Sequence, residues 1–470
     1  MSIHWLDYAI IILYFFVVVY IGYWAMKKVT NFDDYAVAGR GLPMSIFFAA
    51  IAATLCGGGA TIGRVSFMHT TGIVVFAGLI GVVINQIFSG LYIAGRVHNI
   101  KNVYSVGDLF GLYYGRAGRL VSSIVCFFFC LGLYGVQILA MGAILQTAVG
   151  IDLIPAALIS SVITLAYTWS GGILAVTLTD AVQYVIIVIG VTLCAYLAID
   201  HLGGFDAMMS ILYSNPRFET NWSLVQFLGL FFSFLLGEFC APYYIQRYAS
   251  TKSAKDSKNG LLIFGVHWIF FMATTAAIGL ASMAIQPDVK PDLAFTNLIR
   301  DILPPGITGL VFGALLAAVM STGAAMINTS AVIYTRDIYN KFINTAATQA
   351  DLLRQSRLST LVVGGISIGV AIIFQDVFGL MIYMFKLWPS AILPPLMCGL
   401  LWGKISPYAG APAVIAGGLS FFLWSDKVLG EPFGIPANFI GIGMNCLVLF
   451  FVHQKMKGHK PEGPFLPDLN

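Results

Sequence analysis

The sequence contains few charged residues for its length. Only 10% of its 470 residues are Asp, Glu, Lys or Arg, whereas about a quarter of the residues of a soluble domain are charged. Hydrophobic residues make up 59%. This composition excludes a water-soluble globule, a disordered chain and a nucleic-acid-binding protein. The formal net charge of +4 gives no reason to expect a polyanionic partner.

Paired cysteines are lacking as well. The seven cysteines all lie inside apolar runs, and no two of them have the spacing of metal ligands or of a redox motif. We therefore expect neither a disulfide framework nor a zinc site. The sequence also contains no phosphate-cradling glycine loop and no nucleophile elbow, so nothing in it predicts an enzyme.

What the chain does contain is a series of long apolar runs. A bilayer core about 30 Å thick requires roughly 20 apolar residues per helix, and such runs must be helical because lipid cannot satisfy an open backbone. The sequence therefore predicts an all-α membrane protein with 13 transmembrane helices. The runs are 6–26, 43–69, 73–97, 120–149, 154–169, 173–199, 224–245, 261–285, 307–334, 358–374, 377–402, 409–424 and 435–452.

The Lys and Arg residues are distributed asymmetrically between the two sides of this arrangement. One set of connecting segments holds 19 of them and the other set holds four, while Arg64 and Lys386 fall within spans. Cytoplasmic loops are the ones that carry the excess of positive charge. The pattern predicts a multi-pass protein of a plasma membrane, the inner membrane in a bacterium, with its N-terminus outside and its C-terminus inside.

Two of the predicted spans contain helix-breaking residues. The second span holds Gly57, Gly58 and Gly59, and each glycine costs about 1 kcal/mol relative to alanine within a helix. The seventh span holds Gly237 and Pro242, and proline removes a backbone hydrogen bond. Taken alone, either site is explained as well by close packing or a simple kink as by a discontinuous helix.

The positions of the two breaks are more informative than either break alone. They lie five crossings apart, so the two helices run in opposite directions, as in an inverted repeat whose first helices are discontinuous. The sequence thus predicts an alternating-access transporter with a 5+5 inverted repeat. The expected units are 1–42 (an extra N-terminal helix and loop), 43–199 (the first repeat), 200–223 (an outer loop), 224–402 (the second repeat) and 403–470 (two more helices and a tail). The inner segment 99–119 is expected to be a solvated connector.

Oxygen atoms suited to an alkali cation occur in the ninth span. Ala318, Ser321 and Thr322 stand at positions i, i+3 and i+4, so a carbonyl and two hydroxyls share one helix face. Hard cations prefer such oxygen ligands. The alternative is that both hydroxyls simply bond to carbonyls of their own helix.

Several segments together resemble the sodium:solute symporter family, which has a leucine-transporter-like fold. The segments are 38–40 (AGR), 171–183 (GGILAVTLTDAVQ), 246–247 (QR), 303–306 (LPPG) and 317–322 (AAVMST). The first break is also similar to that of the choline-transporter branch, except that Leu55 stands where that branch has an aromatic residue.

The resemblance implies a sodium site and an ion exit. The implied sodium ligands are the carbonyls of Ala53, Cys56 and Ala318 and the hydroxyls of Ser321 and Thr322, and Asp180 matches an acid near the cytoplasmic exit. Relatives with a second sodium carry hydroxyls where this chain has Ala324 and Ala325. We therefore expect one sodium ion per cycle, with proton coupling as the alternative.

Charged residues within the spans point to the solute, because intramembrane charges are usually functional. Arg64 and Lys386 outnumber Glu238, and a guanidinium matches a carboxylate group well. This favours a carboxylate-bearing solute, either an organic acid or an amino-acid-like zwitterion. Alternatively, Arg64 and Glu238 pair as an outer gate while Lys386 extends to the interface. The other candidate solute or gate residues are Gly57, Gly58, Gly59, Gln86 and Gln137.

The sequence therefore predicts a sodium-coupled symporter that imports a small organic solute and has the lipid bilayer as its surroundings. The alternatives are the same cycle with a neutral solute such as a sugar, polyol or nucleobase, and a receptor that binds solute without moving it. No nucleic-acid partner is expected, and the sequence leaves the oligomeric state undecided.

Overall fold

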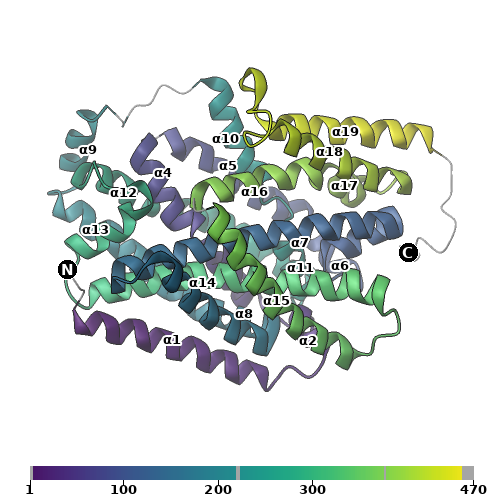
Figure 1. Ribbon diagram of the computed structural model, residues 1–470, viewed down its shortest axis with the longest axis horizontal. Helices are drawn as coiled ribbons and strands as arrows, with labels where there is room; N and C mark the ends of the chain where they lie inside the picture. Colours follow the sequence, from purple (N-terminus) through teal and green to yellow (C-terminus); the bar gives the residue numbers. More distant parts are fainter. Residues whose placement is uncertain (1–3, 73, 217, 219–222, 375–376, 458–470) are drawn as a thin grey trace.

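The computed structural model describes residues 4–72, 74–216, 218, 223–374 and 377–457. Residues 1–3, 73, 217, 219–222, 375–376 and 458–470 lie outside the described chain, so each of the five predicted units is described only in part. The described chain is helical, without a strand, and its helices run mostly along the long axis of the molecule (Figure 1). The predicted all-α fold is confirmed.

The helices follow the apolar runs. The α-helices are α1 (Trp5–Met26), α2 (Phe32–Val37), α3 (Met44–Leu55), α4 (Arg64–Thr71), α5 (Val74–Tyr92), α6 (Ala94–Asn99), α7 (Val106–Val149), α8 (Leu153–His201), α9 (Phe205–Tyr213), α10 (Leu224–Leu236), α11 (Pro242–Ser250), α12 (Ala254–Ile285), α13 (Ala294–Ile302), α14 (Ile307–Ile333), α15 (Gln349–Phe374), α16 (Val377–Ala391), α17 (Leu393–Met397), α18 (Gly410–Trp424) and α19 (Ala437–Lys455). Short π- or 3-10 turns are η1 (Ala38–Arg40), η2 (Gly59–Gly63), η3 (Pro291–Leu293), η4 (Tyr334–Ile343), η5 (Cys398–Trp402), η6 (Pro407–Ala409) and η7 (Pro432–Gly434).

Helix length alone supports fewer crossings than the sequence predicts. Among the described residues, eight helices are long and apolar enough to cross a membrane, or up to ten if each of two bent pairs is one span. α8 includes two predicted runs, which meet at Gly172 in a backbone with φ of 54°. α10 is a shorter apolar helix. The count of 13 and the orientation of the termini therefore stay predictions.

Both predicted helix breaks are present. α3 ends at Leu55, and the helical segment that resumes at Gly59 is bent from it by 58°. α10 ends at Leu236, Cys240 has a φ of 54°, and α11 begins with Pro242, a position where proline fits a helix. The structure adds a third bend of 52° between α16 and α17, which the sequence analysis did not predict.

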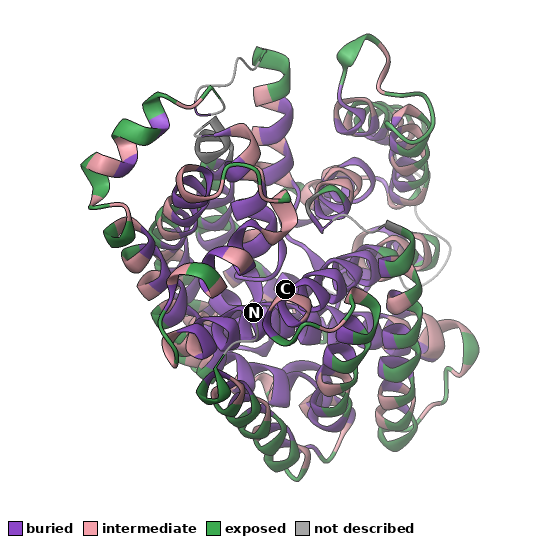
Figure 2. Cartoon of the chain, turned by 60° about the vertical axis from the view of Figure 1, so that its left-hand side comes forward, coloured by how far each residue is buried: buried purple, intermediate pink, exposed green. Residues whose placement is uncertain are grey.

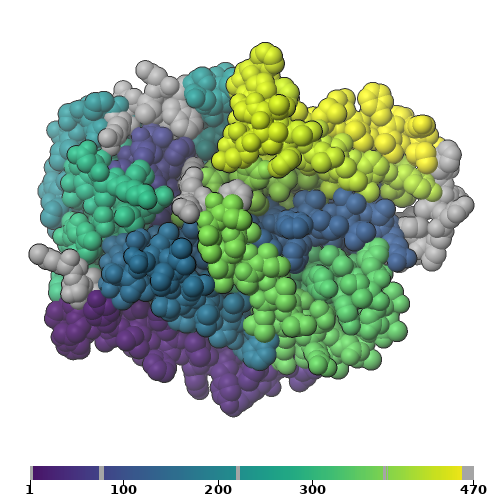
Figure 3. Space-filling view, in the orientation of Figure 1, coloured from purple at the N-terminus to yellow at the C-terminus, as the bar shows by residue number. Residues whose placement is uncertain are grey.

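α14 is the centre of the bundle. In its most apolar window 94% of the residues are buried, and it contacts α1, α3, α7 and α8. Figure 2 shows the buried segments gathered in the middle and the exposed ones along the outer helices. Large apolar side chains on the outer faces, such as Phe16 at 71% exposure, are suited to contact with lipid. On one face α15 lies against α7 (Figure 3).

The segment 99–119 differs from the solvated connector predicted for it. α7 begins at Val106, bends at Gly115 with φ of 67°, and buries Asp108 within its first turns. Arg119 makes this burial possible, because its Nη1 lies 2.6 Å from Asp108 Oδ1 and 2.9 Å from Asp337 Oδ1. Paired charges of this kind can be buried where single ones cannot.

Candidate ion and solute site

The end of α3 meets the middle of α14. A helix that stops leaves its last carbonyls without partners, and two of these carbonyls accept hydrogen bonds from side chains of α14. The Ser321 hydroxyl donates to the Ala53 carbonyl oxygen at 2.9 Å, and the Thr322 hydroxyl donates to the Thr54 carbonyl oxygen at 2.6 Å. The same hydroxyls lie 2.8 and 3.1 Å from the Ala318 carbonyl oxygen. We call these five residues the oxygen cluster.

The structure brings four of the five implied sodium ligands into this cluster. Cys56 is buried beside it, and its amide donates to the carbonyls of Ala52 and Ala53. No described contact joins the Cys56 carbonyl to α14, whereas Thr54 contributes a carbonyl that the sequence analysis did not name. Which carbonyls face α14 depends on the residue at which α3 unwinds, and the glycine run did not specify that residue.

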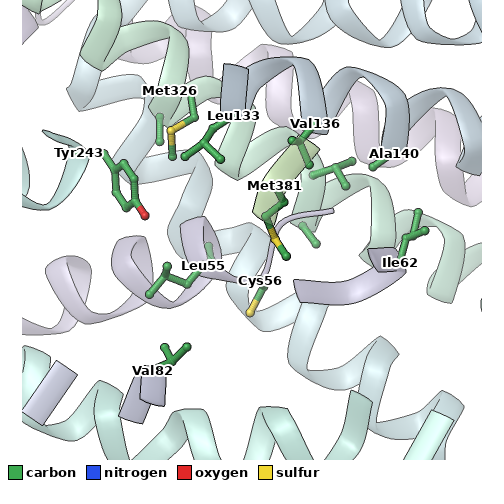
Figure 4. Close-up of a cluster of buried hydrophobic side chains, with 14 of the residues drawn as sticks. Leu55, Cys56, Ile62, Val82, Leu133, Val136, Ala140, Tyr243, Met326 and Met381 are labelled. Carbon is green, nitrogen blue, oxygen red and sulfur yellow. The ribbon is translucent and has the colours of Figure 1, made fainter. Parts of the chain in front are cut away.

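The glycines of the first break allow close approach to neighbouring helices. A Cβ on Gly57 would collide with the Thr322 hydroxyl and would lie 2.8 Å from Gln137 Oε1. A Cβ on Gly59 would collide with the Met381 sulfur, which lies above the broken helix in Figure 4. The Gly58 amide donates to Gln137 Oε1 at 2.7 Å. Gln137 thus satisfies a backbone group that the break has freed.

A buried ion pair lies next to the oxygen cluster. Arg247 Nη2 is 3.0 Å from Asp180 Oδ2, and the two side chains are 1% and 0% exposed. The same nitrogen donates to the Thr54 hydroxyl at 2.7 Å. Asp180 comes from α8, Arg247 from α11 and Thr54 from α3, so the pair connects both broken helices to α8. Removing one member would leave a buried charge without a partner.

A small cavity lies between the two breaks. It holds ≈ 40 Å³ of water-accessible space, which is room for a few water molecules. Thr322 of the oxygen cluster, Gly57 and Gly59 of the first break and Glu238 of the second break all line it. Its other walls are mainly apolar and aromatic, and are formed by Leu55, Val82, Leu133, Phe234, Trp268, Met326, Met381 and Phe385. The cavity therefore adjoins both the oxygen cluster and the break that carries a carboxylate.

Arg64 and Glu238 both line this cavity, but each has its own partner. Arg64 Nη1 donates to the Thr275 hydroxyl at 3.2 Å, and its guanidinium lies 5.2 Å from the centre of the Trp268 ring, within the range of a cation–π interaction. The Tyr243 hydroxyl donates to Glu238 Oε1 at 2.7 Å. Among the described residues no ion pair joins Arg64 to Glu238, so the direct gate pair considered above is not formed.

Three predicted solute or gate residues, Gly58, Gln86 and Lys386, are not among the residues that line the cavity. Lys386 Nζ is 2.7 Å from Glu431 Oε1 in the connection between α18 and α19. Gln86 donates to the Tyr244 hydroxyl at 2.6 Å and does not line the cavity. The side chains of Lys386 and Gln86 do not reach the cavity, because depth along a helix does not determine the direction in which a side chain points, and their roles as solute or gate residues stay predictions.

The aromatic part of the site was not predicted from the sequence. Trp268 on α12 lines the cavity, and its indole nitrogen has no hydrogen-bond partner within the described chain. A buried tryptophan usually finds a partner for this nitrogen. Nothing in the apolar run 261–285 marks this tryptophan as the residue that faces a cavity.

The chain resembles known transporters along most of its length. The sodium:solute symporter family model matches residues 35–417. The osmoregulated proline transporter OpuE of Bacillus subtilis (strain 168) is 25% identical over 447 residues, which are 90% of this chain and 89% of that protein. The sodium/proline symporter of Escherichia coli (strain K12) is 25% identical over 435 residues, with 88% and 86% covered.

Solved structures show the same fold. A substrate-bound, outward-open Na+-coupled sialic acid symporter has a TM-score of 0.81 at 19% identity and covers 98% of this chain and all of its own. Mhp1, a nucleobase-cation-symport-1 family transporter in a closed conformation, has a TM-score of 0.62 at 13% identity, with 92% and 96% covered. The fold is therefore leucine-transporter-like, as the sequence predicted. The chain belongs to the sodium:solute symporter family: it is a membrane transporter and not an enzyme, and sodium is its coupling ion.

Proposed function

We propose that this symporter imports a small amino-acid-like zwitterion, with proline as the first solute to test. The observation that carries this proposal is the presence of Arg64 and Glu238 around one cavity, each held by a separate partner. A zwitterion offers a carboxylate to the guanidinium and an ammonium group to the carboxylate. The relatives named for proline transport support the choice of test solute.

The oxygen cluster is the proposed sodium site. Sodium entering it would take the lone pairs of the Ser321 and Thr322 hydroxyls and of the Ala53 and Ala318 carbonyls, and the hydroxyl protons would turn away. All of these ligands are neutral oxygens, which suit a hard monovalent cation. Because Ala324 and Ala325 offer no hydroxyls on the next turn, we propose one sodium ion per cycle. Asp180, held by Arg247, marks the proposed exit side.

Coupling follows from the position of the first break. Thr322 belongs to the oxygen cluster and also lines the cavity, and Gly57 lies against it. Sodium that draws the end of α3 onto α14 therefore also sets the shape of the solute cavity. Such coupling is reciprocal, so a bound solute must increase the affinity for sodium by the same factor.

The proposed topology has 13 crossings, the repeats 43–199 and 224–402, an outer N-terminus and an inner C-terminus. α1 begins at one end of the bundle and α19 finishes toward the other end (Figure 1), as an odd number of crossings requires. The excess of Lys and Arg on one side supports the orientation. Bacterial relatives support the inner membrane as the location.

Membrane voltage distinguishes the candidate solute classes. A potential of 100 mV contributes about 2.3 kcal/mol per charge, and a tenfold sodium gradient adds about 1.4 kcal/mol. With one sodium, a zwitterion uses both contributions and can be concentrated roughly several hundredfold. A monoanion moving with one sodium transfers no net charge, so voltage would not drive its uptake.

The test is uptake of labelled proline by proteoliposomes in sodium or potassium medium, with and without an inside-negative potential. We expect uptake that requires sodium and rises with the potential. Ser321→Ala should raise the half-saturating sodium concentration about tenfold, as expected when a ligand hydrogen-bonded in the protein is lost. Ser330→Ala, further along the same helix, is the matched control and should behave like the unchanged protein.

Three results would contradict parts of the proposal. Uptake driven by a pH gradient without sodium would show that the coupling ion is a proton and not sodium. Uptake that does not change with the membrane potential would indicate that the solute is a monoanion. If neutral sugars are transported and Arg64→Ala lowers the uptake of all solutes equally, the arginine is a gate residue and the solute is neutral. Where proline fails, thermal stabilisation by amino acids, organic acids and sugars, each with sodium and with potassium, identifies the solute through linkage.

A further inference from the structure

Two grooves of similar size open on the face where α15 crosses α7. One lies toward the α15 C-terminal end, has a volume of ≈ 450 Å³, and is lined by residues such as Leu139, Leu153 and Ile368. The other lies toward the α15 N-terminal half, has a volume of ≈ 490 Å³, and also contacts η4. We call the first the C-side groove and the second the N-side groove. Neither includes a residue of the oxygen cluster or of the solute cavity.

The walls of the N-side groove are apolar and open to the outside of the bundle. Phe128 of α7 is 55% exposed, and Leu358, Val362 and Ile366 of α15 are 54%, 51% and 47% exposed. These three α15 residues are spaced four residues apart and form one stripe along the helix. In a bilayer such a stripe contacts hydrocarbon, and a groove beside it is shaped for one acyl chain rather than for water.

All three walls of the N-side groove carry a cation toward the same end. Arg116 lies two turns before Ile124 on α7, Lys341 lies one turn after Ile338 on η4, and Arg354 directly precedes Gln355 on α15. α7 and α15 run in one direction and α14 with η4 runs in the other (Figure 1), and α7, η4 and α15 contact one another, so these positions lie toward the same end of the groove. The Arg116 guanidinium is fixed 4.8 Å from the Phe342 ring centre.

Neighbouring acids leave this end of the groove cationic. Asp351 lies one turn before Gln355, where it accepts hydrogen bonds from the Thr348 amide and hydroxyl at 3.0 and 2.8 Å. Asp108 and Asp337 are buried, and they form ion pairs with Arg119 and Arg336. Gln355 and Ser359 line the groove between the cations and the apolar stripe, and supply groups that can bond a phosphate or a glycerol ester.

The C-side groove has the opposite character. The part of its lining that the structure describes includes Gln146 and Asp152 but neither Lys nor Arg. It has nearly the same volume and lies on the same face, yet it offers a carboxylate where the N-side groove offers cations. It therefore serves as an internal reference for the effect of charge.

We propose that the N-side groove binds one anionic phospholipid. Its acyl chain lies along the Leu358–Val362–Ile366 stripe, and its phosphate faces Lys341, Arg354 and Arg116. Basic pockets between helices on the cytoplasmic side are suited to anionic headgroups, and the proposed topology places this end of the groove in the inner leaflet. The lipid would join η4, the continuation of the ion-site helix, to α15.

The experiment compares binding of phosphatidylglycerol and phosphatidylcholine with identical acyl chains to the purified full-length protein by native mass spectrometry. We expect one phosphatidylglycerol to bind preferentially. Lys341→Gln combined with Arg354→Gln should reduce this preference, by roughly fivefold for each cation removed. Asp152→Asn in the C-side groove is the matched control and should leave the preference unchanged.

A second variant tests the apolar half of the site. Val362→Trp fills the groove without changing its charge and should remove the preferentially bound phosphatidylglycerol, while sodium-dependent stabilisation is retained. The proposal is overturned if the unchanged protein shows no preference, if the double variant keeps it, or if Val362→Trp leaves it intact. It is also overturned if glycerol phosphate, which lacks acyl chains, competes as well as the lipid does. Because binding is read directly, these outcomes do not depend on which solute is transported.

Discussion

The two helix breaks differ in what they present to the interior. At the first break, glycines leave the backbone uncovered, and carbonyls of Ala53 and Thr54 meet hydroxyls of α14. At the second break, Glu238 projects into the cavity and is oriented by Tyr243. One break contributes main-chain oxygens and the other contributes a side chain.

Under the proposed function, this difference separates the binding of the ion from the binding of the solute. Backbone carbonyls are present whatever the side chain, so an ion site built from them depends on geometry and close approach. A site built from a side chain depends on the identity of that residue. Substitutions at the first break should therefore act on sodium, and substitutions at the second should act on solute selection.

The largest effect is expected for Gly57→Val. A side chain at this position would collide with Thr322 and crowd Gln137, and a buried, close-packed site cannot absorb the added volume. Sodium-dependent uptake should be abolished, and sodium should no longer stabilise the purified protein in a thermal-shift assay. Gly313→Ala on α14 is the control, because a Cβ there meets nothing within 4 Å. Wild-type sodium stabilisation in Gly57→Val would show that the first break is not the ion site.

Glu238→Gln is expected to have the next largest effect, and on the solute. Hydrogen bonds to charged groups contribute about 1.5–3 kcal/mol, so KM for a zwitterion should rise by roughly 10- to 100-fold. The half-saturating sodium concentration measured at saturating solute should change little. Glu431→Gln is the matched control, since this glutamate pairs with Lys386 outside the cavity. A large shift in sodium dependence, without a change in KM, would reverse the assignment of the two breaks.

The breaks themselves could be predicted from the sequence, because glycine runs and proline act on the local backbone. The contact between α3 and Ser321 and Thr322 was also anticipated, through the resemblance to the family and through the shared helix face. The breaks and this contact both depend on the residue types within a short segment of the sequence. The same holds for the all-helical fold, which follows from the apolar runs.

Other parts of the site depend on packing that the sequence does not encode locally. Trp268 was missed because an aromatic residue in an apolar run gives no sign of facing a cavity. Lys386 was placed near the solute by its depth, yet it turns to Glu431 on a connection far along the chain. The burial of Asp108 was missed because its ion-pair partners Arg119 and Arg336 lie 11 and 228 residues away in sequence. Such long-range pairs follow only from the assembled fold.

Trp388→Phe probes the support of the second break and should have a moderate effect. The Trp388 indole nitrogen donates to the Phe239 carbonyl oxygen at 2.7 Å in the buried interior. Leaving that carbonyl unpaired costs about 1–3 kcal/mol, which should lower the melting temperature and raise KM up to roughly tenfold. Trp424→Phe is the control, because Trp424 also donates to a carbonyl, that of Ile435, but at an exposed site. Equal changes in melting temperature and KM for both variants would show that the buried hydrogen bond from Trp388 to Phe239 has no special role.

The smallest effect is expected for Asp7→Ala, which acts on α14, the helix of the proposed ion site, far from either break. Asp7 Oδ1 accepts hydrogen bonds from the amides of Gly306 and Gly309, both at 2.7 Å, and so caps the start of α14. Loss of a cap costs about 0.5–2 kcal/mol, and the cost should appear as a lower melting temperature. Asp7→Asn, which keeps one acceptor, should lose less. Because α14 is buried along its length, we expect sodium dependence and KM to stay nearly constant. A selective loss of sodium affinity would instead mean that the position of α14, and not only the break in α3, sets the ion site.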